Sequence, residues 1–365
     1  MQINTITCHD VYNHGASLQA YALQTYLESI GNDVRIIDYK PDYLSGHYNL
    51  NTVANPRYDQ PIIKQLYLLA KLPGRLISLR RKKAFDAFTK RYLHLTDMRY
   101  QCYEELKANP PQADVYIAGS DQIWNTLFQN GRDAAFYLDF APKSSKRISY
   151  AASFATNGVV EKYKPIVIRM LKNFNNVSIR ERNSLTLLTE LGRADGVAVC
   201  DPVFLLTKEQ WNSIIPYRNI QDKYLLVYDT ERSEKIKVIA KRIAKIKNLN
   251  IYNISAFKLS YANKDFWASG PLEFVRLIRD AQVVISNSFH ASAFSIIFER
   301  DFYVINRSEE INERMKSLLA DFGIDNRLVS SLESLPMTPI NYEAVNRLKE
   351  NKILASKRFL NDTIG

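Results

Sequence analysis

A polar turn in the last third of the chain combines the features of an anion site. The apolar run 283–285 leads into the turn 286–288 and then into Phe289 and His290, where a helix is predicted to begin. Hydroxyl and amide side chains, free backbone N–H groups and the positive end of the helix dipole favour a negatively charged ligand there. His290 would add a hydrogen-bond or proton donor, because imidazole titrates near neutral pH. An ordinary capped helix with a packed histidine fits the local pattern equally well.

A second candidate is Arg180, which directly follows the strand predicted at 177–179. Ligands of open parallel sheets bind beyond the carboxyl ends of the strands, so Arg180 should project toward a cleft between domains. The alternative is a surface ion pair between Arg180 and Glu181, which is the commoner fate of such a dipeptide.

Two further loops, 13–17 and 119–125, carry weaker signals. The segment around Gly15 resembles a phosphate-binding turn only in part, because it has one glycine and lacks the full GxGxxG pattern. Gly15 could simply permit a tight turn between strand and helix. Asp121 could orient a hydroxyl or act as a base, and Trp124 offers a flat face on which sugars stack. Local pattern alone favours a helix N-cap for Asp121 and a core position for Trp124.

The elements that position these loops alternate between strand and helix in two series. Strands of the first series are predicted at 3–7, 34–37, 115–118, 147–151, 177–179 and 197–200, with helices at 18–27, 165–174 and 184–192. Strands of the second are predicted at 224–228, 250–254, 282–286 and 302–305, with helices at 233–247, 271–280, 289–299 and 309–321. Two such series indicate two parallel-sheet α/β domains.

The predicted organisation is an N-terminal domain over 1–215, a C-terminal domain over 216–335 and a helical extension over 336–365. The best linker is 216–222, and residues 342–360 form an amphipathic helix in the extension. A basic helical insertion at about 41–112 interrupts the first series, with proline-separated helices at 62–72 and 75–92. The segment 75–91 is strongly basic, and its structural alternatives are a solvated face or a membrane-docking face.

The chain of 365 residues has 49 Lys and Arg against 38 Asp and Glu, which gives a net charge of +11. This excess of positive charge indicates a negatively charged ligand or binding surface. Its start lacks the pattern of a secretory signal, and its apolar runs fall far short of the roughly 18 residues of a membrane span. Cys8, Cys102 and Cys200 form no CxxC pair, which favours reduced thiols in a cytoplasmic protein. The spacing of His9 and His14 does not favour a metal site, and none is expected.

Five motifs, in this order and spacing, resemble those of the polysaccharide pyruvyl transferase family from about residue 3 to about residue 330. They are Asn13-x-Gly15-Ala16-x-Leu18, Gly119-Ser120-Asp121-Gln122-Ile123-Trp124-Asn125, Ser178-x-Arg180-Glu181, Asp201-Pro202-Val203 and Ser288-Phe289-His290-Ala291. The resemblance implies two Rossmann-like domains facing a cleft, as in GT-B glycosyltransferases. It also implies transfer of pyruvate from phosphoenolpyruvate to a sugar of a cell-surface glycan or its lipid-linked precursor, as a cyclic ketal.

On this basis His290, Arg180 and Asp121 are the predicted catalytic residues. The predicted substrate-binding residues are Asn13, Gly15, Ser120, Trp124, Asn125, Glu181, Asn287, Ser288, Phe289 and Arg307. Many members of the family carry arginine where this chain has Ser288, so Arg307, Arg314 or Arg327 would have to supply that charge.

No metal or redox cofactor is expected for this chemistry. The expected partners are phosphoenolpyruvate and an oligosaccharide or lipid-linked acceptor. The basic helix near 75–91 is expected to contact the anionic inner face of the cytoplasmic membrane. A nucleotide-sugar glycosyltransferase on the same architecture is the main alternative. A nucleic-acid-binding protein is disfavoured, because the basic segment lacks interleaved aromatic residues and no nucleic-acid module is visible.

Overall fold

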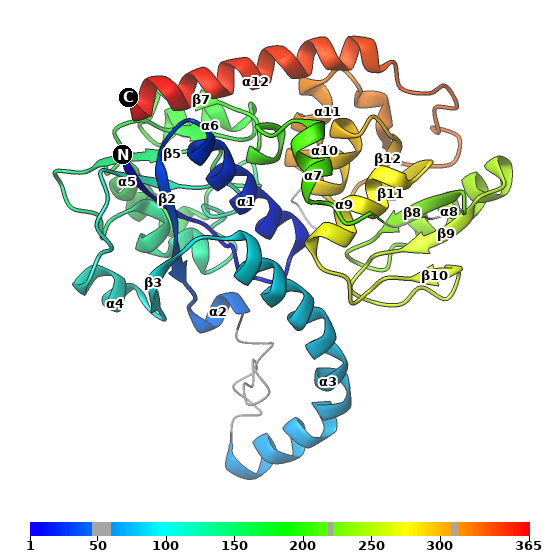
Figure 1. Cartoon of the computed structure of the whole chain (residues 1–365), viewed down its shortest axis with the longest axis horizontal. Coiled ribbons are helices and arrows are strands. Elements are labelled where there is room, and N and C mark those ends of the chain that lie inside the picture. The colour runs from blue at the N-terminus through cyan, green and yellow to red at the C-terminus, as the bar shows by residue number, and fades with distance from the viewer. Residues whose placement is uncertain (46–59, 218–221, 308–311) are drawn as a thin grey trace.

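The computed structural model describes residues 1–45, 60–217, 222–307 and 312–365. In these residues the chain builds two main parallel sheets, one from each half of the sequence, and a small two-stranded sheet (Figure 1). The N-terminal sheet has the strand order β3-β2-β1-β4-β5 and the C-terminal sheet the order β10-β9-β8-β11-β12-β13. The predicted α/β class with two parallel sheets is therefore confirmed.

The N-terminal half contains one main sheet, a small sheet beside it, and the helices that cover them. The strands are β1 (Gln2–Ile6), β2 (Asp33–Tyr39), β3 (Leu95–Tyr100), β4 (Val115–Ala118), β5 (Lys146–Ser149), β6 (Ser178–Ile179) and β7 (Val197–Ala198). The helices are α1 (His14–Ser29), α2 (Asp42–Ser45), α3 (Pro61–Tyr92), α4 (Tyr103–Ala108), α5 (Lys164–Leu171), α6 (Ser184–Glu190) and α7 (Lys208–Ile214). Short 3-10 helices lie at Asn130–Arg132, Ala134–Tyr137, Glu161–Tyr163 and Pro202–Phe204.

The C-terminal half repeats this alternation and ends in a long helix. The strands are β8 (Tyr224–Tyr228), β9 (Asn250–Asn253), β10 (Lys264–Asp265), β11 (Val283–Ser286), β12 (Asp301–Ile305) and β13 (Leu328–Val329). The helices are α8 (Glu234–Lys247), α9 (Pro271–Asp280), α10 (Phe289–Ile297), α11 (Glu313–Asp321) and α12 (Tyr342–Ile364), with a 3-10 helix at Asp325–Arg327. Every residue of β8 and β11 is buried, as expected for continuous apolar strands covered on both faces of a parallel sheet.

Both sheets change their winding direction beside the first strand of their half. Strand β1 lies between β2 and β4, and β8 lies between β9 and β11. A crevice forms at the carboxyl ends of the strands at such a switch point, and ligands bind there. The loops that follow β1, β4 and β11 are those that the sequence singled out at 13–17, 119–125 and 286–290. The topology thus explains why polar residues gather in these loops.

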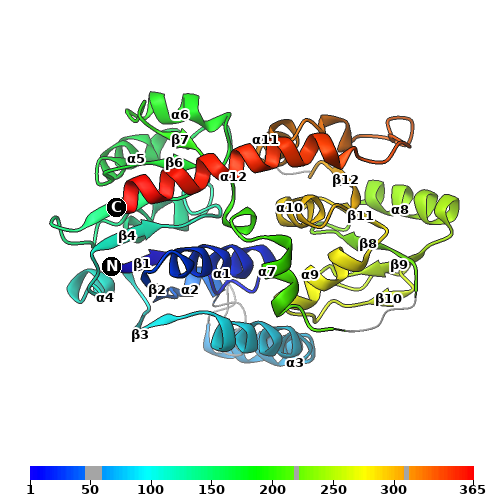
Figure 2. The same cartoon turned by 45° about the horizontal axis from the view of Figure 1, so that its top comes forward.

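The two halves share one large apolar core and are tied together by α12. Figure 2 shows α12 running across both halves. Near its C-terminal end, Ser356 accepts a hydrogen bond from the backbone N–H of Cys200 at 2.8 Å. At its other end, the hydroxyl of Tyr342 donates to the carbonyl of Ser295 at 3.2 Å. The helix predicted at 342–360 therefore packs against both halves.

His14, in the first turn of α1, joins the N-terminal half to the C-terminal half. Its ring is fully buried and stacks on Phe274 of α9 at 4.7 Å between centroids. Its Nε2 lies 3.1 Å from the carbonyl oxygen of Ser269. Burial, with a further contribution from the charge of Arg81, holds the pKa of His14 well below its ordinary value. His14 is therefore a neutral packing residue at this junction.

This environment predicts a pH dependence of stability. Below about pH 6.5, His14 binds a proton in the unfolded chain but not in the native protein. His14 should therefore lower the free energy of unfolding by about 1.4 kcal/mol for each pH unit that the pH falls. Urea unfolding between pH 7 and 5 should show a shallower decline for His14→Phe than for the wild type. His94→Gln, at an exposed histidine, is the control for the loss of one imidazole. Equal slopes for all three proteins would contradict this assignment.

The segment predicted as two helices, at 62–72 and 75–92, is one continuous helix, α3. The prediction of an interruption at Pro73 and Gly74 is wrong, because a proline removes one backbone hydrogen bond and can bend a helix without ending it. Figure 1 shows that α3 curves along its length. The sequence also missed the edge strand β3, whose LTDMRY segment is only partly buried.

Parts of three predictions fall outside the described residues. These are 218–221 of the predicted linker, 309–311 of the predicted helix at 309–321, and 46–59 of the predicted insertion. Among the helices that the structure describes, none has the length and apolar character needed to cross a membrane.

Candidate active site

Asp201, which follows β7, is the centre of a buried polar cluster between the two halves. Its Oδ2 accepts hydrogen bonds from Ser120 Oγ and Arg180 Nη1, both at 3.0 Å, and lies 3.5 Å from His290 Nε2. Its Oδ1 accepts from the backbone N–H of Val203 at 3.1 Å. Burial alone would raise the pKa of Asp201, but His290, Arg180 and this N–H together hold it well below its usual range. Asp201 is therefore an anion that fixes two candidate catalytic side chains.

Arg180 pairs with Glu181 as the simpler interpretation expected, but the pair is buried rather than on the surface. Its Nε donates to Glu181 Oε1 at 2.8 Å, and its guanidinium lies 4.1 Å from the ring centre of Phe289 in α10. Burial opposes the charged form, yet Glu181, Asp201 and Asp121 raise the pKa of Arg180 above its ordinary value. In the part of the chain that the structure describes, Arg180 Nη2 has no hydrogen-bond partner. One donor of this cation thus remains available to a ligand.

Arg314 of α11 is a buried cation of a different kind. It is 7% exposed, its Nε has no partner, and it makes no hydrogen bond or ion pair with any residue in the described ranges. The pKa of Arg314 is lowered to about 10, first by burial and then by the charges of Arg180 and Arg307. Asp121 and Glu181 act in the opposite direction. An unpaired buried charge is costly, so this arrangement favours an anionic ligand beside Arg314.

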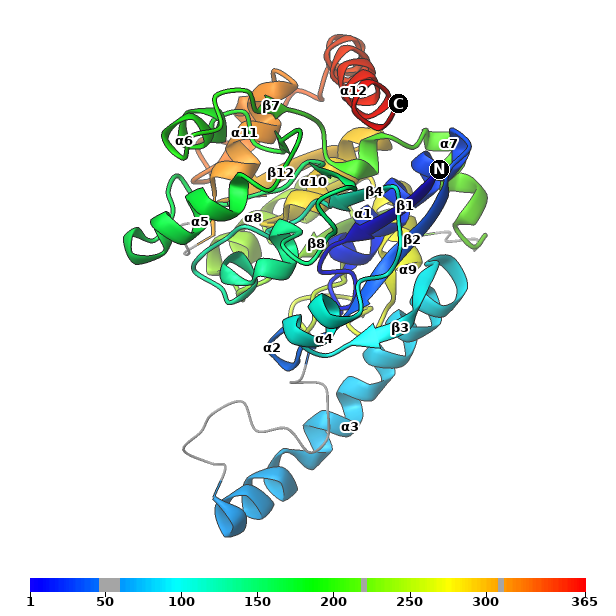
Figure 3. The ribbon, with the colours of Figure 1, turned by 90° about the vertical axis from the view of Figure 1, so that its left-hand side faces the viewer.

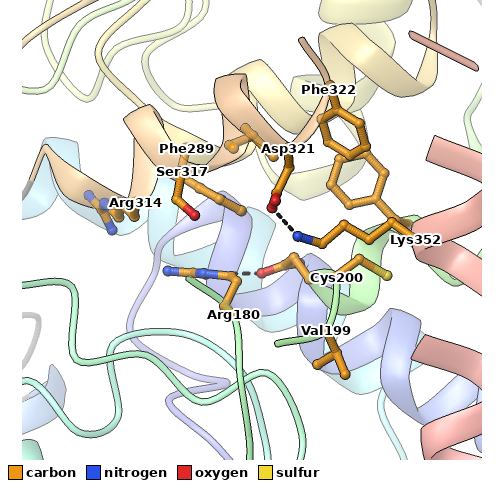
Figure 4. Close-up of a pocket in the computed structure, with 12 residues that line it drawn as sticks. Arg180, Val199, Cys200, Phe289, Arg314, Ser317, Asp321, Phe322 and Lys352 are labelled. Carbon is orange, nitrogen blue, oxygen red and sulfur yellow. Dashed lines mark hydrogen bonds and ion pairs between the residues drawn. The ribbon is translucent and has the colours of Figure 1, made fainter. Parts of the chain in front are cut away.

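A small pocket of about 10 Å³ lies between the two halves of the chain, and both arginines line it. Figure 4 shows Arg180 and Arg314 on one side of it, with the Asp321–Lys352 ion pair on the other. Lys352 belongs to α12, so the C-terminal helix closes this side of the pocket.

Two helix N-termini also meet at this place. His290, in the first turn of α10, packs so closely on Gly15 of α1 that a Cβ at Gly15 would lie 1.9 Å from His290 Nδ1. Asn13 caps α1, accepting from the N–H groups of Gly15 and Ala16. Ser288 precedes α10 and makes no such capping hydrogen bond. The first N–H groups of α10 therefore receive no bond from the Ser288 side chain, and the positive end of its dipole lies beside the two arginines.

The contact between Gly15 and His290 predicts the effect of adding one methyl group. Gly15→Ala should displace the imidazole of His290, a candidate catalytic side chain, and lower turnover at least tenfold. A displacement of about 1 Å is enough to slow a reaction strongly. Overpacking should also cost about 1–3 kcal/mol of stability. Gly158→Ala is the matched control, since a Cβ there meets nothing within 4 Å. Wild-type turnover by Gly15→Ala in a steady-state assay would contradict the packing role.

The predicted site residues fall into two groups. The structure brings Asn13, Gly15, Ser120, Arg180, Glu181, Phe289 and His290 together around Asp201, with Asp121 and Arg307 near enough for their charges to act on Arg314. Asp121 has a left-handed backbone (φ 76°), and no helix begins after it, so the N-cap interpretation is wrong. Arg327 lies elsewhere and pairs with Asp301 at 3.2 Å.

Trp124, Asn125 and Asn287 are buried parts of the scaffold. Trp124 is fully buried, stacks on Tyr137 and donates from Nε1 to the carbonyl of Phe136, so its ring is not presented to a sugar. Asn125 caps its own loop through the N–H of Leu127. The carbonyl oxygen of the Asn287 side chain accepts from the N–H and hydroxyl of Thr230, which holds the loop after β8. These contacts support the core interpretation of Trp124.

Sequence reasoning placed Asp201 in a motif but assigned it no role. The structure makes it the shared partner of Ser120, Arg180 and His290. The Asp-Pro dipeptide reads locally as a turn, and the side chain does accept from Val203 as a turn residue would. Its second carboxylate oxygen acquires its partners only through tertiary contacts. Within the described residues, no group of three or more His, Cys, Asp and Glu is arranged to hold a metal ion.

Solved structures resemble this chain in fold. The structure of MnaA from S. aureus with UDP is 13% identical, with 99% of this chain and 95% of that chain covered and a TM-score of 0.51. The UDP-GlcNAc 2-epimerase from Neisseria meningitidis bound to UDP-GlcNAc is 11% identical, with 100% and 99% covered and a TM-score of 0.50. At such low identity the likeness shows the fold alone, which is GT-B-like, with two Rossmann-like domains facing a cleft.

No curated protein gives a significant sequence match. A sequence model of the polysaccharide pyruvyl transferase family matches residues 13–309, and this range contains all the residues around Asp201. Because the match covers most of the chain, the protein belongs to the polysaccharide pyruvyl transferase family.

Proposed function

We propose that this chain transfers pyruvate from phosphoenolpyruvate to a sugar, as a cyclic ketal. The observation that carries the proposal is the unpaired buried Arg314 beside Arg180, at the N-terminus of α10. Phosphoenolpyruvate carries a phosphate and a carboxylate, and these two cations with the helix N–H groups are suitable donors for them. Arg314 and Arg307 supply the charge that Ser288 lacks.

Proton transfer is the proposed role of His290. Protonation of C3 of the enolpyruvyl group by the imidazolium makes C2 electrophilic. Asp201 lies beside Nε2 of His290, so it orients the ring. One sugar hydroxyl then bonds to C2, and the bond from C2 to the phosphate oxygen breaks.

A second hydroxyl of the sugar bonds to C2 and closes the ketal. Of the two hydroxyl protons, one restores His290 and the other leaves with phosphate. Asp121 lies near the arginines and is the proposed group that orients the attacking hydroxyl. This scheme itself calls for no metal ion or redox cofactor.

The acceptor that we propose is a sugar of a cell-surface glycan or of its lipid-linked precursor. Phosphoenolpyruvate is made inside cells, so we place the reaction in the cytoplasm. A lipid-linked acceptor would hold the sugar at the inner face of the cytoplasmic membrane.

Calorimetric titration separates this proposal from a nucleotide-sugar glycosyltransferase. We expect phosphoenolpyruvate to bind the wild type and UDP-GlcNAc to bind weakly or not at all. Arg314→Met should remove the heat of phosphoenolpyruvate binding. Tight binding of UDP-GlcNAc with no binding of phosphoenolpyruvate would refute the proposal and favour the glycosyltransferase.

A further inference from the structure

The N-terminal half of α3 extends away from both sheets. Figures 1 and 3 show it projecting away from the other described helices and strands. The helix has 32 residues, which corresponds to about 48 Å of length. Such a helix needs an explanation, because most helical stability in proteins comes from packing against other elements.

The other end of α3 is held firmly against both halves of the chain. Arg81 is buried and donates to the carbonyls of Trp267 and Tyr12, at 3.1 and 3.2 Å. Phe85 is buried against the ring of His14, with 5.1 Å between centroids. Gly270 approaches Ala84 so closely that a Cβ there would lie 3.0 Å from the Ala84 carbonyl oxygen. These contacts fix the direction in which the projecting half points.

The projecting half exposes large apolar side chains, which we call the apolar tip: Ile63, Leu66, Leu69 and Leu72. Leu66 is 65% exposed and Leu69 is 71% exposed, while Ile63 and Leu72 are about two-fifths exposed. Residues 63–72 contain two lysines and no acid. Single exposed leucines are ordinary, but a cluster of them on one projecting helix marks an interaction surface.

Exposed cations follow the apolar tip along the same helix. We call these the basic collar: Arg80, Lys83, Lys90 and Arg91. At about 100° per residue, Leu66, Leu69, Leu72 and the whole collar fall within an arc of roughly 120° on an ideal helix. Arg81 is turned inward, and Lys82 pairs with Asp86. One side of α3 is thus apolar toward its free end and cationic toward its anchored end.

We propose that α3 docks the protein on an anionic lipid bilayer, with the apolar tip in the headgroup and acyl boundary and the basic collar on lipid phosphates. Helices that lie in the membrane interface combine an apolar face with Lys and Arg in this way. Basic residues near the surface of an anionic leaflet each add to binding. A second copy of the chain is a poorer occupant, because two basic collars would meet on molecules that each carry +11.

Docking of α3 on a membrane would place the protein at the proposed location of the reaction. It does not depend on whether phosphoenolpyruvate is the donor. It also extends the predicted contact. The sequence singled out the basic residues of 75–91, and the structure adds exposed apolar side chains before them, at 63–72.

Co-sedimentation with vesicles tests the proposal. The full-length wild type should bind vesicles of phosphatidylglycerol mixed with phosphatidylcholine, and binding should weaken with salt. The double variant Leu66→Ser, Leu69→Ser should bind at least tenfold more weakly, because it loses apolar area for insertion. Arg80→Gln and Lys83→Gln should each lower the affinity for these vesicles about fivefold and reduce the preference for the anionic lipid.

The matched control is Leu354→Ser on α12, which removes a leucine that is 60% exposed. It should bind vesicles like the wild type. Phosphate release from phosphoenolpyruvate with a water-soluble acceptor should be unchanged in the tip variant, so failure of docking and failure of the proposed function give different results. Wild-type binding by the tip variant, no binding by the wild type, or a concentration-dependent dimer that only the tip variant abolishes would overturn the proposal.

Discussion

Replacing Arg314 with methionine should make the unliganded chain more stable and should weaken donor binding on the order of a hundredfold. Arg314 is buried without a hydrogen-bond or ion-pair partner among the described residues, so its charge costs free energy that an apolar side chain of similar length avoids. Replacement of poorly compensated buried charges by apolar residues is neutral or stabilising by about 1–4 kcal/mol. In Arg314→Met, a bound anion loses a charged hydrogen bond to the guanidinium and the attraction of its charge. This loss should reduce the free energy of binding by about 2–3 kcal/mol. Urea unfolding and calorimetric titration with phosphoenolpyruvate measure the two effects.

Arg327→Met is the control for this experiment. Arg327 is as deeply buried, but it pairs with Asp301 and donates to the carbonyl of Thr338. Its loss leaves a buried carboxylate uncompensated and should destabilise the chain by about 3–5 kcal/mol, with donor affinity unchanged. An Arg314→Met protein that is less stable than the wild type and still binds the donor normally would show that Arg314 is structural.

The second large effect is expected from His290→Asn, which should lower turnover by about 10²–10⁴-fold. This is the usual contribution of a positioned acid or base. The asparagine keeps a polar side chain beside Asp201 but cannot supply a proton. Donor affinity should fall much less than turnover, because Arg180 and Arg314 remain. Initial rates of phosphate release, with donor affinity measured separately, distinguish the two quantities.

His94→Asn serves as the reference for the histidine substitution. His94 lies on the surface beside Glu28 and far in the sequence from every residue of the cluster. Its replacement should leave turnover unchanged. If His290→Asn loses affinity and turnover in equal proportion, His290 binds the donor and does not transfer the proton.

The regular parts of the fold could be predicted because their signals are local. The strand at 224–228 and the helix at 271–280 have the predicted bounds, since apolar runs and a proline at the helix start define them. The strand β3 could not be predicted, because an edge strand with half its residues exposed carries little apolar signal. The continuity of α3 through Pro73 depends on the whole helix rather than on that dipeptide.

The candidate site was predictable in position and less so in its partners. His290 follows β11 beside the switch point of the C-terminal sheet, and Arg180 follows β6 of the small sheet. Both residues come directly after strands, where ligands of parallel sheets bind. The roles of Asp201 and Gly15 depend on tertiary contacts that span about 80 residues or more of sequence, which spacing does not encode. Arg314 is one of three arginines that could replace a missing charge, and the sequence does not show that Arg327 is paired with Asp301 whereas Arg314 has no ion-pair partner among the described residues.

The most direct test of the account is phosphate release from phosphoenolpyruvate in the presence of hexose and N-acetylhexosamine acceptors, with the sugar product analysed by mass spectrometry. We predict acceptor-dependent phosphate release and a product heavier by the mass of one pyruvyl ketal. His290→Asn should abolish most of both signals, and His94→Asn should retain them. No phosphate release with any acceptor, together with no binding of phosphoenolpyruvate to the wild type, would contradict the account.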